Sequence, residues 1–410
     1  MKKRFKLSLF LFRRDFRVVD NKGLAEALKQ SQKVIPLVII DPREEKVGHC
    51  YGNDRLRQFR AESLFDLLQA LSKKGGELFV ATGRLDTLLI RLLHVLPVEA
   101  LFFVADYNPD GILAGREIAR VCVKTGIVFQ VIHDRLLIGD PAKLLNKSEK
   151  PFQMFSPFLR VAEKQGYRSM VRISRGSWWR GSFPVPVVDV MEFSGAEKGG
   201  VKGGRAAGLR ILRRIRRWCD YAKTRDIPSL PTTRLAAYLH QGCLSVREVA
   251  DTIKKSLGLR HELIRQLYWR DFFTYLCFWF PRMFERPCRR KYESIRWRRD
   301  RTVFRRWCIG ETTEQFVNAG MHELVSTGFM HNRLRMIVAS YLTKDLHIDW
   351  RWGERFFARY LIDYDPAVNN GNWQWVASVG CSAMPPFRKF SPETQQKKFD
   401  SQRHYTKQWI

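Results

Sequence analysis

Residues 6–12 read KLSLFLF, and this short apolar run is the first of five that decide the fold. The others are VIPLVII at 34–40, ELFVAT at 77–82, ALFFVADY at 100–107 and IVFQVIHD at 127–134. Apolar runs of this length are typical of strands that are buried on both faces. Leucines and Phe59 at helical spacing occupy the segment between the second and third runs. Strands separated by helices predict an α/β domain with a doubly wound parallel sheet over residues 1–135.

The pattern changes after residue 135. Residues 136–205 are rich in Gly, Pro and Ser and lack periodicity, so we expect a connector between two domains. Beyond it, apolar side chains recur every three or four residues in the segments 208–225, 245–258, 261–280 and 320–346. This spacing predicts an all-α domain over residues 206–410. The first domain contains neither GxGxxG nor GxxxxGK[ST], so its fold alone assigns no ligand.

The charge of the chain indicates a polyanionic partner. The 410 residues carry a formal net charge of +31, and this excess favours nucleic acid. Between residues 281 and 307, eleven Lys or Arg side chains stand against three acidic ones, with aromatic side chains between them. Such a segment is suited to contacts with the phosphate backbone. An anionic membrane surface is the alternative, but no apolar run approaches the roughly 20 residues that span a bilayer.

The remaining composition predicts a cytoplasmic protein. The opening MKKRFKLSLFLFRRDFR places charges directly after its short apolar run, unlike a signal peptide. The eight cysteines include no CxxC pair, so neither a zinc site nor a disulfide framework is indicated. We expect reduced thiols, no metal and a monomer.

Residues 369–375 read NNGNWQW and follow LIDYD at 361–365. Upstream, GFMHNRLRMIVAS at 328–340 adds two arginines and a further amide, Asn332. Asp, Asn and Arg side chains are costly to bury unless each has a charged or hydrogen-bonding partner. We therefore expect a large, flat and polar ligand among these residues.

Longer segments resemble DNA photolyases of the photolyase/cryptochrome family over nearly the whole chain. These segments are 9–28, the FSPF at 155–158, 232–247, 266–273, 328–357 and 361–378. The resemblance implies a class I cyclobutane pyrimidine dimer photolyase, that is, a deoxyribodipyrimidine photo-lyase. It implies non-covalent FAD in the helical domain, binding of ultraviolet-damaged DNA, and dimer repair by light-driven electron transfer from the reduced FAD.

The resemblance also implies the residues that hold FAD. They are Tyr221, Thr232, Thr233, Arg270, Asn332, Arg335, Asp363, Asp365 and Asn369. Hydroxyls and amides of the two threonines suit the pyrophosphate, with Arg270 as a second phosphate contact. Arg335 and Asp363 are expected to pair beside the flavin ring, where such a pair tunes its charge. Asn369 is expected to reach the flavin N5.

The same resemblance implies residues for the lesion and for electron transfer. The substrate residues are Gln266, Trp269, Asn332, Met336 and Trp375. The catalytic residues are Asn369 and the three indoles of an electron-hopping chain, Trp373, Trp350 and Trp297. An indole can stack on a flipped-out lesion, and a damaged base pair is the one that flips at least cost.

Two departures from the family pattern leave alternatives open. Gln266 stands where dimer photolyases have Glu, and this Gln resembles (6-4) photolyases and animal cryptochromes. Asn332 and Met336 argue against that alternative, because (6-4) enzymes have two histidines there. A cryptochrome-like photoreceptor or a (6-4) photolyase-like protein with weak or no dimer repair is therefore the second reading. Asp110 and Gly111 replace the Asn-Glu pair of folate-using photolyases, so a second, antenna chromophore of unknown identity stays open and folate is not favoured.

Overall fold

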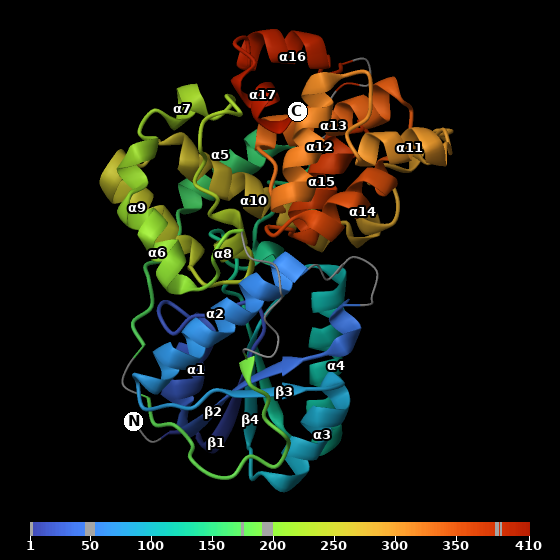
Figure 1. Ribbon diagram of the computed structural model, residues 1–410. Coiled ribbons are helices and arrows are strands. Elements are labelled where there is room, and N and C mark those ends of the chain that lie inside the picture. The colour runs from blue at the N-terminus through green and yellow to red at the C-terminus, as the bar shows by residue number, and fades with distance from the viewer. Residues whose placement is uncertain (1–2, 46–53, 174–175, 191–199, 382–384, 386–387) are drawn as a thin grey trace.

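The computed structural model describes residues 3–45, 54–173, 176–190, 200–381, 385 and 388–410. Figure 1 shows a sheet flanked by helices, with a larger helical region packed above it. The two regions match the expected α/β and all-α parts of the chain. No helix in these ranges is long and apolar enough to cross a membrane.

The sheet has five parallel strands in the order β3-β2-β1-β4-β5. The strands are β1 (Phe5–Phe12), β2 (Ser31–Ile40), β3 (Phe79–Thr82), β4 (Ala100–Val104) and β5 (Val128–Ile132). The helices between them are α1 (Lys22–Gln30), α2 (Asp54–Ser72), α3 (Leu85–Val95) and α4 (Pro109–Thr125). This arrangement confirms the doubly wound α/β prediction.

Side chains of β1 alternate between the two faces of the sheet. Phe10 and Phe12 join the core under α1 and α2, whereas Leu9 and Leu11 join the core under α3 and α4. A strand places successive side chains on opposite faces, and both faces of this sheet are covered by helices (Figure 1). This double burial explains why the strand sequences are continuously apolar.

The described part of the segment after the sheet is more ordered than its composition predicts. It contains α5 (Phe155–Gln165), which begins at the FSPF sequence. Further along, Trp178 forms a backbone bridge with Val34 beside β2, and Phe183 stacks on Phe79 at 4.3 Å. Aromatic packing on the sheet thus holds this Gly- and Pro-rich segment, although it lacks helical or strand periodicity.

The rest of the described chain is helical, as predicted. Its first helices are α6 (Arg205–Arg213), α7 (Tyr221–Thr224), α8 (Ala236–His240), α9 (Val246–Leu257) and α10 (Glu262–Trp279). The later ones are α11 (Arg301–Cys308), α12 (Gln315–Thr327), α13 (Asn332–Ser340), α14 (Trp350–Tyr360), α15 (Pro366–Val376), α16 (Pro392–Phe399) and α17 (His404–Trp409). Short turns η5 (Pro281–Phe284) and η6 (Arg290–Tyr292) lie within the basic segment.

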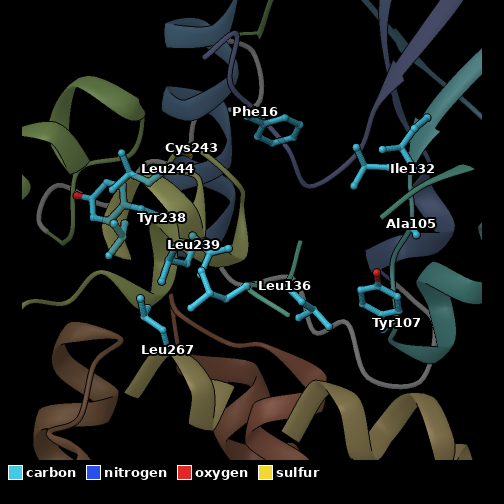
Figure 2. Close-up of a cluster of buried hydrophobic side chains, with 14 of the residues drawn as sticks. Phe16, Ala105, Tyr107, Ile132, Leu136, Tyr238, Leu239, Cys243, Leu244 and Leu267 are labelled. Carbon is cyan, nitrogen blue, oxygen red and sulfur yellow. The ribbon is translucent and has the colours of Figure 1, made fainter. Parts of the chain in front are cut away.

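A continuous apolar core joins the sheet region to the helical region. Figure 2 shows part of this core, with Phe16, Tyr107 and Leu136 from the sheet side and Leu239 and Leu267 from the helical side. A buried ionic cluster adds to this contact. Arg247 of α9 lies 2.9 Å from Asp20 and 2.6 Å from Asp134. Because breaking a buried ion pair is costly, these contacts hold the two regions together.

One cysteine pair differs from the expectation of reduced thiols. Cys288 and Cys381 are joined in a disulfide, with their Cα atoms 5.4 Å apart and a sequence separation of 93. The pairing depends on the turn after η5 lying beside the end of α15, where Cys288 N donates to Gln374 Oε1 at 2.9 Å. Spacing in the sequence does not reveal such a contact.

Candidate functional site

The turn between α14 and α15 carries the carboxylates of the candidate site. Asp365 caps α15, and its Oδ1 accepts hydrogen bonds from Ala367 N at 3.0 Å and Val368 N at 3.3 Å. Its Oδ2 lies 3.1 Å from Nδ1 of His240 at the end of α8. Burial opposes ionisation of Asp365, but the hydrogen bond of His240 and the charges of Arg270 and Arg135 hold its pKa well below the usual range. Burial lowers the pKa of His240 itself. Asp365 is therefore an anchored carboxylate.

Arg335 of α13 pairs with Asp363, as the sequence predicts. Its Nη2 lies 3.0 Å and 3.1 Å from the two carboxylate oxygens. Its Nε donates to the backbone oxygen of Met330 at 2.8 Å. The guanidinium is thus held by two kinds of acceptor, and a fixed charge pair of this kind can respond to the charge of a bound ring system.

Asn369 of α15 contacts an acidic residue that the sequence reasoning missed. Its Nδ2 donates to Oε1 of Glu354 at 3.1 Å, and the hydroxyl of Tyr364 donates to the same oxygen at 3.2 Å. Burial raises the pKa of Glu354 to about 7, against these two hydrogen bonds. The sequence signal that could have identified Glu354 is a single acid in WRWGERFF, on the apolar face of a helix. Glu354 can therefore hold a proton next to Asn369 near neutral pH.

The expected lesion residues lie on α10, α13 and α15. Asn332 is exposed at the start of α13, with Nδ2 at 3.8 Å from Sδ of Met336. Gln266 of α10 donates through Nε2 to Glu262 Oε1 at 3.0 Å. The starts of both helices are tied to the segment after α7, because Glu262 pairs with Arg225 and Arg333 pairs with Asp226.

Two half-buried indoles accompany these polar residues. Trp269 stacks on Phe155 at 3.5 Å and lies 5.7 Å from Phe273 in the next turn of α10. Phe273 in turn packs against Gly371, where an added Cβ would come within 2.3 Å of its ring. Trp375 lies 6.3 Å from Phe390. Close packing at Gly371 therefore fixes α10 against α15, the helices that carry the two indoles.

The expected phosphate-side residues lie in three separate places. Thr232 and Thr233 are half-buried in the turn before α8, and Tyr221 begins α7. Arg270 donates through Nη1 to the backbone oxygen of Arg135 at 3.0 Å and to Asp271 at 3.2 Å. Within the described chain, no hydrogen bond joins these four residues to the Arg335–Asp363 pair. The structure places them on the elements that the sequence predicts and leaves their common role a prediction.

The expected indole chain has an unforeseen neighbour. Trp373 contacts Phe357 at 5.1 Å and Trp307 at 6.3 Å, both edge to face. It reaches α14 because position 353 is glycine, where a Cβ would lie 2.2 Å from the Trp373 ring. Trp350 is fully buried, and Trp297 is half-buried. Among the described residues, no stacked or edge-to-face ring contact joins Trp350 to Trp373 or Trp297, and the indole N–H of Trp350 has no acceptor.

The residues present fit a flavin dinucleotide. Hydroxyls and a guanidinium suit a diphosphate, while the Arg335–Asp363 pair and Asn369 suit the polar edges of a flavin ring. His331 adds a buried donor. Its Nδ1 accepts from Arg333 N at 3.2 Å, so its proton lies on Nε2, which has no partner in the described chain. Burial lowers the pKa of His331 to about 4, so this donor is neutral.

A second cavity of about 380 Å³ lies at the carboxyl ends of the strands. The strand order reverses between β1 and β4, and open α/β sheets bind ligands at this edge. Phe12, Ile40, Asp106 and Asp110 are among its lining residues. Gly111 also lines it, and a Cβ there would lie 2.5 Å from Asp106. His240, Tyr364 and Pro366 also line it, so the cavity borders the turn that carries Asp365.

Family models match both halves of the chain. Residues 8–174 match the model described as DNA photolyase, and residues 263–410 match the FAD binding domain of DNA photolyase. A deoxyribodipyrimidine photo-lyase of Alkalihalophilus pseudofirmus is 34% identical, over 97% of this chain and 86% of that relative. The chain belongs to the DNA photolyase family. Its helical region is accordingly an FAD-binding domain of that family.

Solved structures of photolyase-family proteins share the fold. An archaeal photolyase from Sulfolobus tokodaii, described with two FAD molecules, has a TM-score of 0.85 and 37% identity, covering 98% of this chain and 90% of that one. A Synechocystis cryptochrome has a TM-score of 0.90 and 27% identity, covering 100% of this chain and 89% of that one. The fold is therefore shared by photolyases and cryptochromes. It does not distinguish their functions, so that distinction depends on the residues of the site.

Proposed function

We propose that this photolyase-family protein is a class I photolyase that splits cyclobutane pyrimidine dimers in DNA with light. The observation that carries the proposal is the contact of Asn332 with Met336 at an exposed helix start, next to the Arg335–Asp363 pair. An amide and a thioether can contact a dimer without adding a base. Repair breaks the two carbon–carbon bonds of the cyclobutane ring and restores two pyrimidine double bonds. When bound, reduced FAD supplies the electron in light and takes it back, so the reaction has no net oxidation.

Residues on several elements are proposed to hold the flavin. Thr232 and Thr233, with Arg270 and Tyr221, bind the diphosphate side. Asp365, Asn369 and Asn332 hydrogen-bond the ring or ribose edges, and the fixed Arg335–Asp363 pair stabilises the charge of the reduced ring. This assignment draws support from the family match of residues 263–410 and from the unpartnered buried donor of His331.

The lesion is proposed to enter between α10, α13 and α15. Trp269 and Trp375 supply flat apolar faces against which a flipped-out dimer can pack. Gln266, Asn332 and Met336 contact the pyrimidine edges. Selectivity for damage follows because a distorted base pair unstacks at lower cost than an intact one.

Reduction of the cofactor in light is proposed to use Trp373, Trp350 and Trp297. Burial of Trp350 and Trp373 and the half-exposed position of Trp297 support a route from the interior to the surface. Indoles are the most easily oxidised side chains. In this route each indole passes an electron inward and is restored from outside.

The basic segment is proposed to contact the DNA backbone. Arg290, Lys291, Arg296 and Arg305 are exposed around η6 and α11. Exposed guanidinium and ammonium groups release counterions when they neutralise phosphates, so the affinity depends on salt. Sequence preference is not expected from these contacts, because phosphate positions carry no base identity.

A cryptochrome-like or (6-4) photolyase-like protein with weak or no dimer repair is the second candidate function. Gln266 and the TM-score of 0.90 to a cryptochrome favour it. The deciding experiment illuminates chemically reduced, FAD-loaded protein with an oligonucleotide that contains one cyclobutane dimer, and follows the recovery of thymine absorbance. A matched oligonucleotide with a (6-4) product is the control. Recovery with the dimer alone supports the proposal, whereas no recovery with FAD bound favours the photoreceptor.

The cavity at the strand ends is proposed to hold an antenna chromophore. The Sulfolobus tokodaii photolyase is described with two FAD molecules, with the implication of a novel light-harvesting cofactor, which supports a second chromophore here. A flavin or deazaflavin is favoured over folate, since Asp110 and Gly111 replace the family's folate contact. The test is the absorption spectrum of the purified protein and excitation transfer to FAD. An FAD stoichiometry of one, with no further absorbing group after expression in a host that makes flavins and deazaflavins, would speak against it.

A further inference from the structure

A basic cavity of about 850 Å³ opens beside α11 and α14, and Arg299 and Arg301 of the basic segment lie in its wall. It is lined by Phe284, Glu285, Arg299, Arg301, Asp349, Arg351, Trp352 and Arg355. Figure 1 shows α11 and α14 at the outer edge of the helical region, opposite α6, α7 and α9. The volume lies within the range of about 300–1,000 Å³ that small-molecule sites occupy.

The cavity is suited to an anion. Its walls carry four arginines against two carboxylates. Asp349 is committed to Arg351, at 2.6 Å. No described carboxylate forms an ion pair with Arg299, Arg301 or Arg355, and all three are exposed. Arginine binds phosphate oxygens through two parallel hydrogen bonds, so several unpaired guanidiniums favour a ligand with more than one phosphate.

The aromatic wall of this cavity connects to the interior. Trp352 lies 5.2 Å from Phe304, edge to face. Phe304 stacks on Trp307 at 5.7 Å, and Trp307 lies 6.3 Å from Trp373. The indole N–H of Trp307, which is fully buried, donates to Val338 O at 3.1 Å. A phenyl ring is harder to oxidise than an indole, so Phe304 acts as a bridge between two oxidisable rings.

We propose that the cavity binds a small phosphate-bearing reductant, of the chemical class of the reduced nicotinamide dinucleotides, and that Trp352 takes one electron from it. The electron then passes through Phe304 and Trp307 to Trp373. This inference rests on the proposed function in one respect, that Trp373 loses an electron when the flavoprotein absorbs light. The electron hole moves outward to Trp352, where the reductant fills it with one electron and releases one proton to water. The reductant radical that remains gives its second electron when a second photon repeats the step, so two one-electron steps oxidise one reductant molecule and reduce one flavin. No bond forms to the protein.

Binding is tested in the dark on the full-length, FAD-loaded protein. NADH is the probe, and its fluorescence anisotropy reports the dissociation constant. The double variant Arg299→Gln and Arg355→Gln should weaken NADH binding by about tenfold or more, because each charged hydrogen bond contributes on the order of 1.5–3 kcal/mol. The double variant Arg299→Lys and Arg355→Lys keeps both charges and should lose less NADH affinity. Inorganic pyrophosphate should compete with NADH, and Arg91→Gln on α3 serves as the distant control.

Electron entry is tested by the rate of flavin reduction in light as NADH is varied. Trp352→Phe keeps the ring packing and removes the indole, so its rate should fall to that of native protein saturated with pyrophosphate. Trp409→Phe, on α17, should keep the native rate. With dithiothreitol, an uncharged reductant, the rate of flavin reduction should change neither with added pyrophosphate nor in the arginine variants. Thermal melts and bound FAD absorbance check that every variant is folded.

Three results would overturn the inference. The first is NADH affinity that is unchanged in the Gln double variant. The second is a native NADH-dependent rate in Trp352→Phe. The third is displacement of NADH by a short undamaged duplex, which assigns the cavity to the DNA backbone. Dimer splitting by dithionite-reduced native protein is measured separately and needs no reductant at the cavity, so its failure contradicts the proposed function while the dark binding result stands.

Discussion

Glu354 and Asn369 meet across α14 and α15, with Asn369 Nδ2 at 3.1 Å from Glu354 Oε1. The contact joins a fully buried acid to the amide that is expected to face the flavin. Because Tyr364 donates to the same oxygen, the carboxyl is held in one position on the protein side of the site. Its protonation state therefore affects both the stability of the fold and the hydrogen-bonding state of Asn369.

Glu354→Gln should remove a pH dependence of stability. The pKa of Glu354 is raised from 4.5 to about 7, so below pH 4.5 both folded and unfolded chains hold the proton. Between pH 4.5 and about 7 only the folded chain keeps the proton, so the free energy of unfolding falls as the pH rises to about 7. The loss is on the order of 3 kcal/mol. Thermal melts of the FAD-loaded protein across this window should show a smaller decline in Glu354→Gln, with exposed Glu311→Gln as control. Parallel curves for native protein and Glu354→Gln would contradict the assignment.

Gly353→Ala should displace Trp373. The added Cβ would lie 2.2 Å from the Trp373 ring, and overpacking of this kind costs about 1–3 kcal/mol. Urea unfolding should show the loss, together with a shift in tryptophan fluorescence. Gly115→Ala in α4 is the matched control, because its nearest atom is 3.7 Å away and alanine stabilises a helix by up to about 1 kcal/mol. Equal effects of the two substitutions would show that the ring can move aside freely.

Arg335→Gln should weaken FAD binding. It removes the partner of Asp363 and leaves a mostly buried carboxylate unpaired. We expect the FAD dissociation constant to rise by about tenfold to a hundredfold, the range for one charged hydrogen bond. Titration of FAD into the apoprotein measures it. Arg333→Gln, on the neighbouring position of α13, controls for loss of a cation. Unchanged affinity in Arg335→Gln would place the flavin elsewhere.

Gln266→Glu should raise the quantum yield of dimer splitting. The amide of Gln266 already lies 3.0 Å from the Glu262 carboxylate, and a like charge so near raises the pKa of an introduced carboxyl. That carboxyl would keep its proton and could donate it in a hydrogen bond to the charged dimer. The gain should fade at high pH, where the proton is lost. Equal yields for native and substituted protein across the pH range would remove Gln266 from the lesion site.

Binding of a dimer-containing duplex should fall steeply with salt. Arg290→Gln with Arg296→Gln should reduce the slope of log affinity against log salt by about 0.9 for each phosphate that the variant no longer neutralises. Fluorescence anisotropy at several salt concentrations measures the slope, and Arg91→Gln on α3 is the control. A native slope near zero would exclude the basic segment from the DNA interface.

Much of the architecture could be predicted from short-range patterns. Five apolar runs predicted the parallel sheet, and three- and four-residue spacing predicted the helical region. The segment 136–205 was less predictable, because α5 and the packing of Phe183 on Phe79 depend on surfaces provided by other parts of the chain. The prediction of reduced thiols was wrong for Cys288 and Cys381 for the same reason.

The candidate site likewise has a part that the sequence predicted and a part that depends on distant segments of the chain. Resemblance along the chain singled out Arg335, Asp363 and Asn369, and the structure pairs the first two. Glu354 was missed although it lies in a segment that resembles the family, because its importance arises from burial and from Asn369 on another helix. Trp307 was missed because an indole on the buried face of a basic helix is indistinguishable from core packing until its neighbours are known.

The sequence by itself determined which elements form and which residue types each element carries, since strand and helix periodicity and turn chemistry act over a few residues. It also determined the strong positive charge and hence the kind of partner. Only the tertiary structure decided which side chains from distant elements share one environment. Burial beside α15 gives Glu354 its raised pKa, the missing Cβ of Gly353 admits Trp373, and the approach of α11 to α14 places Trp352 in a wall of arginines. These properties depend on distances and desolvation, which arise only when the chain is folded.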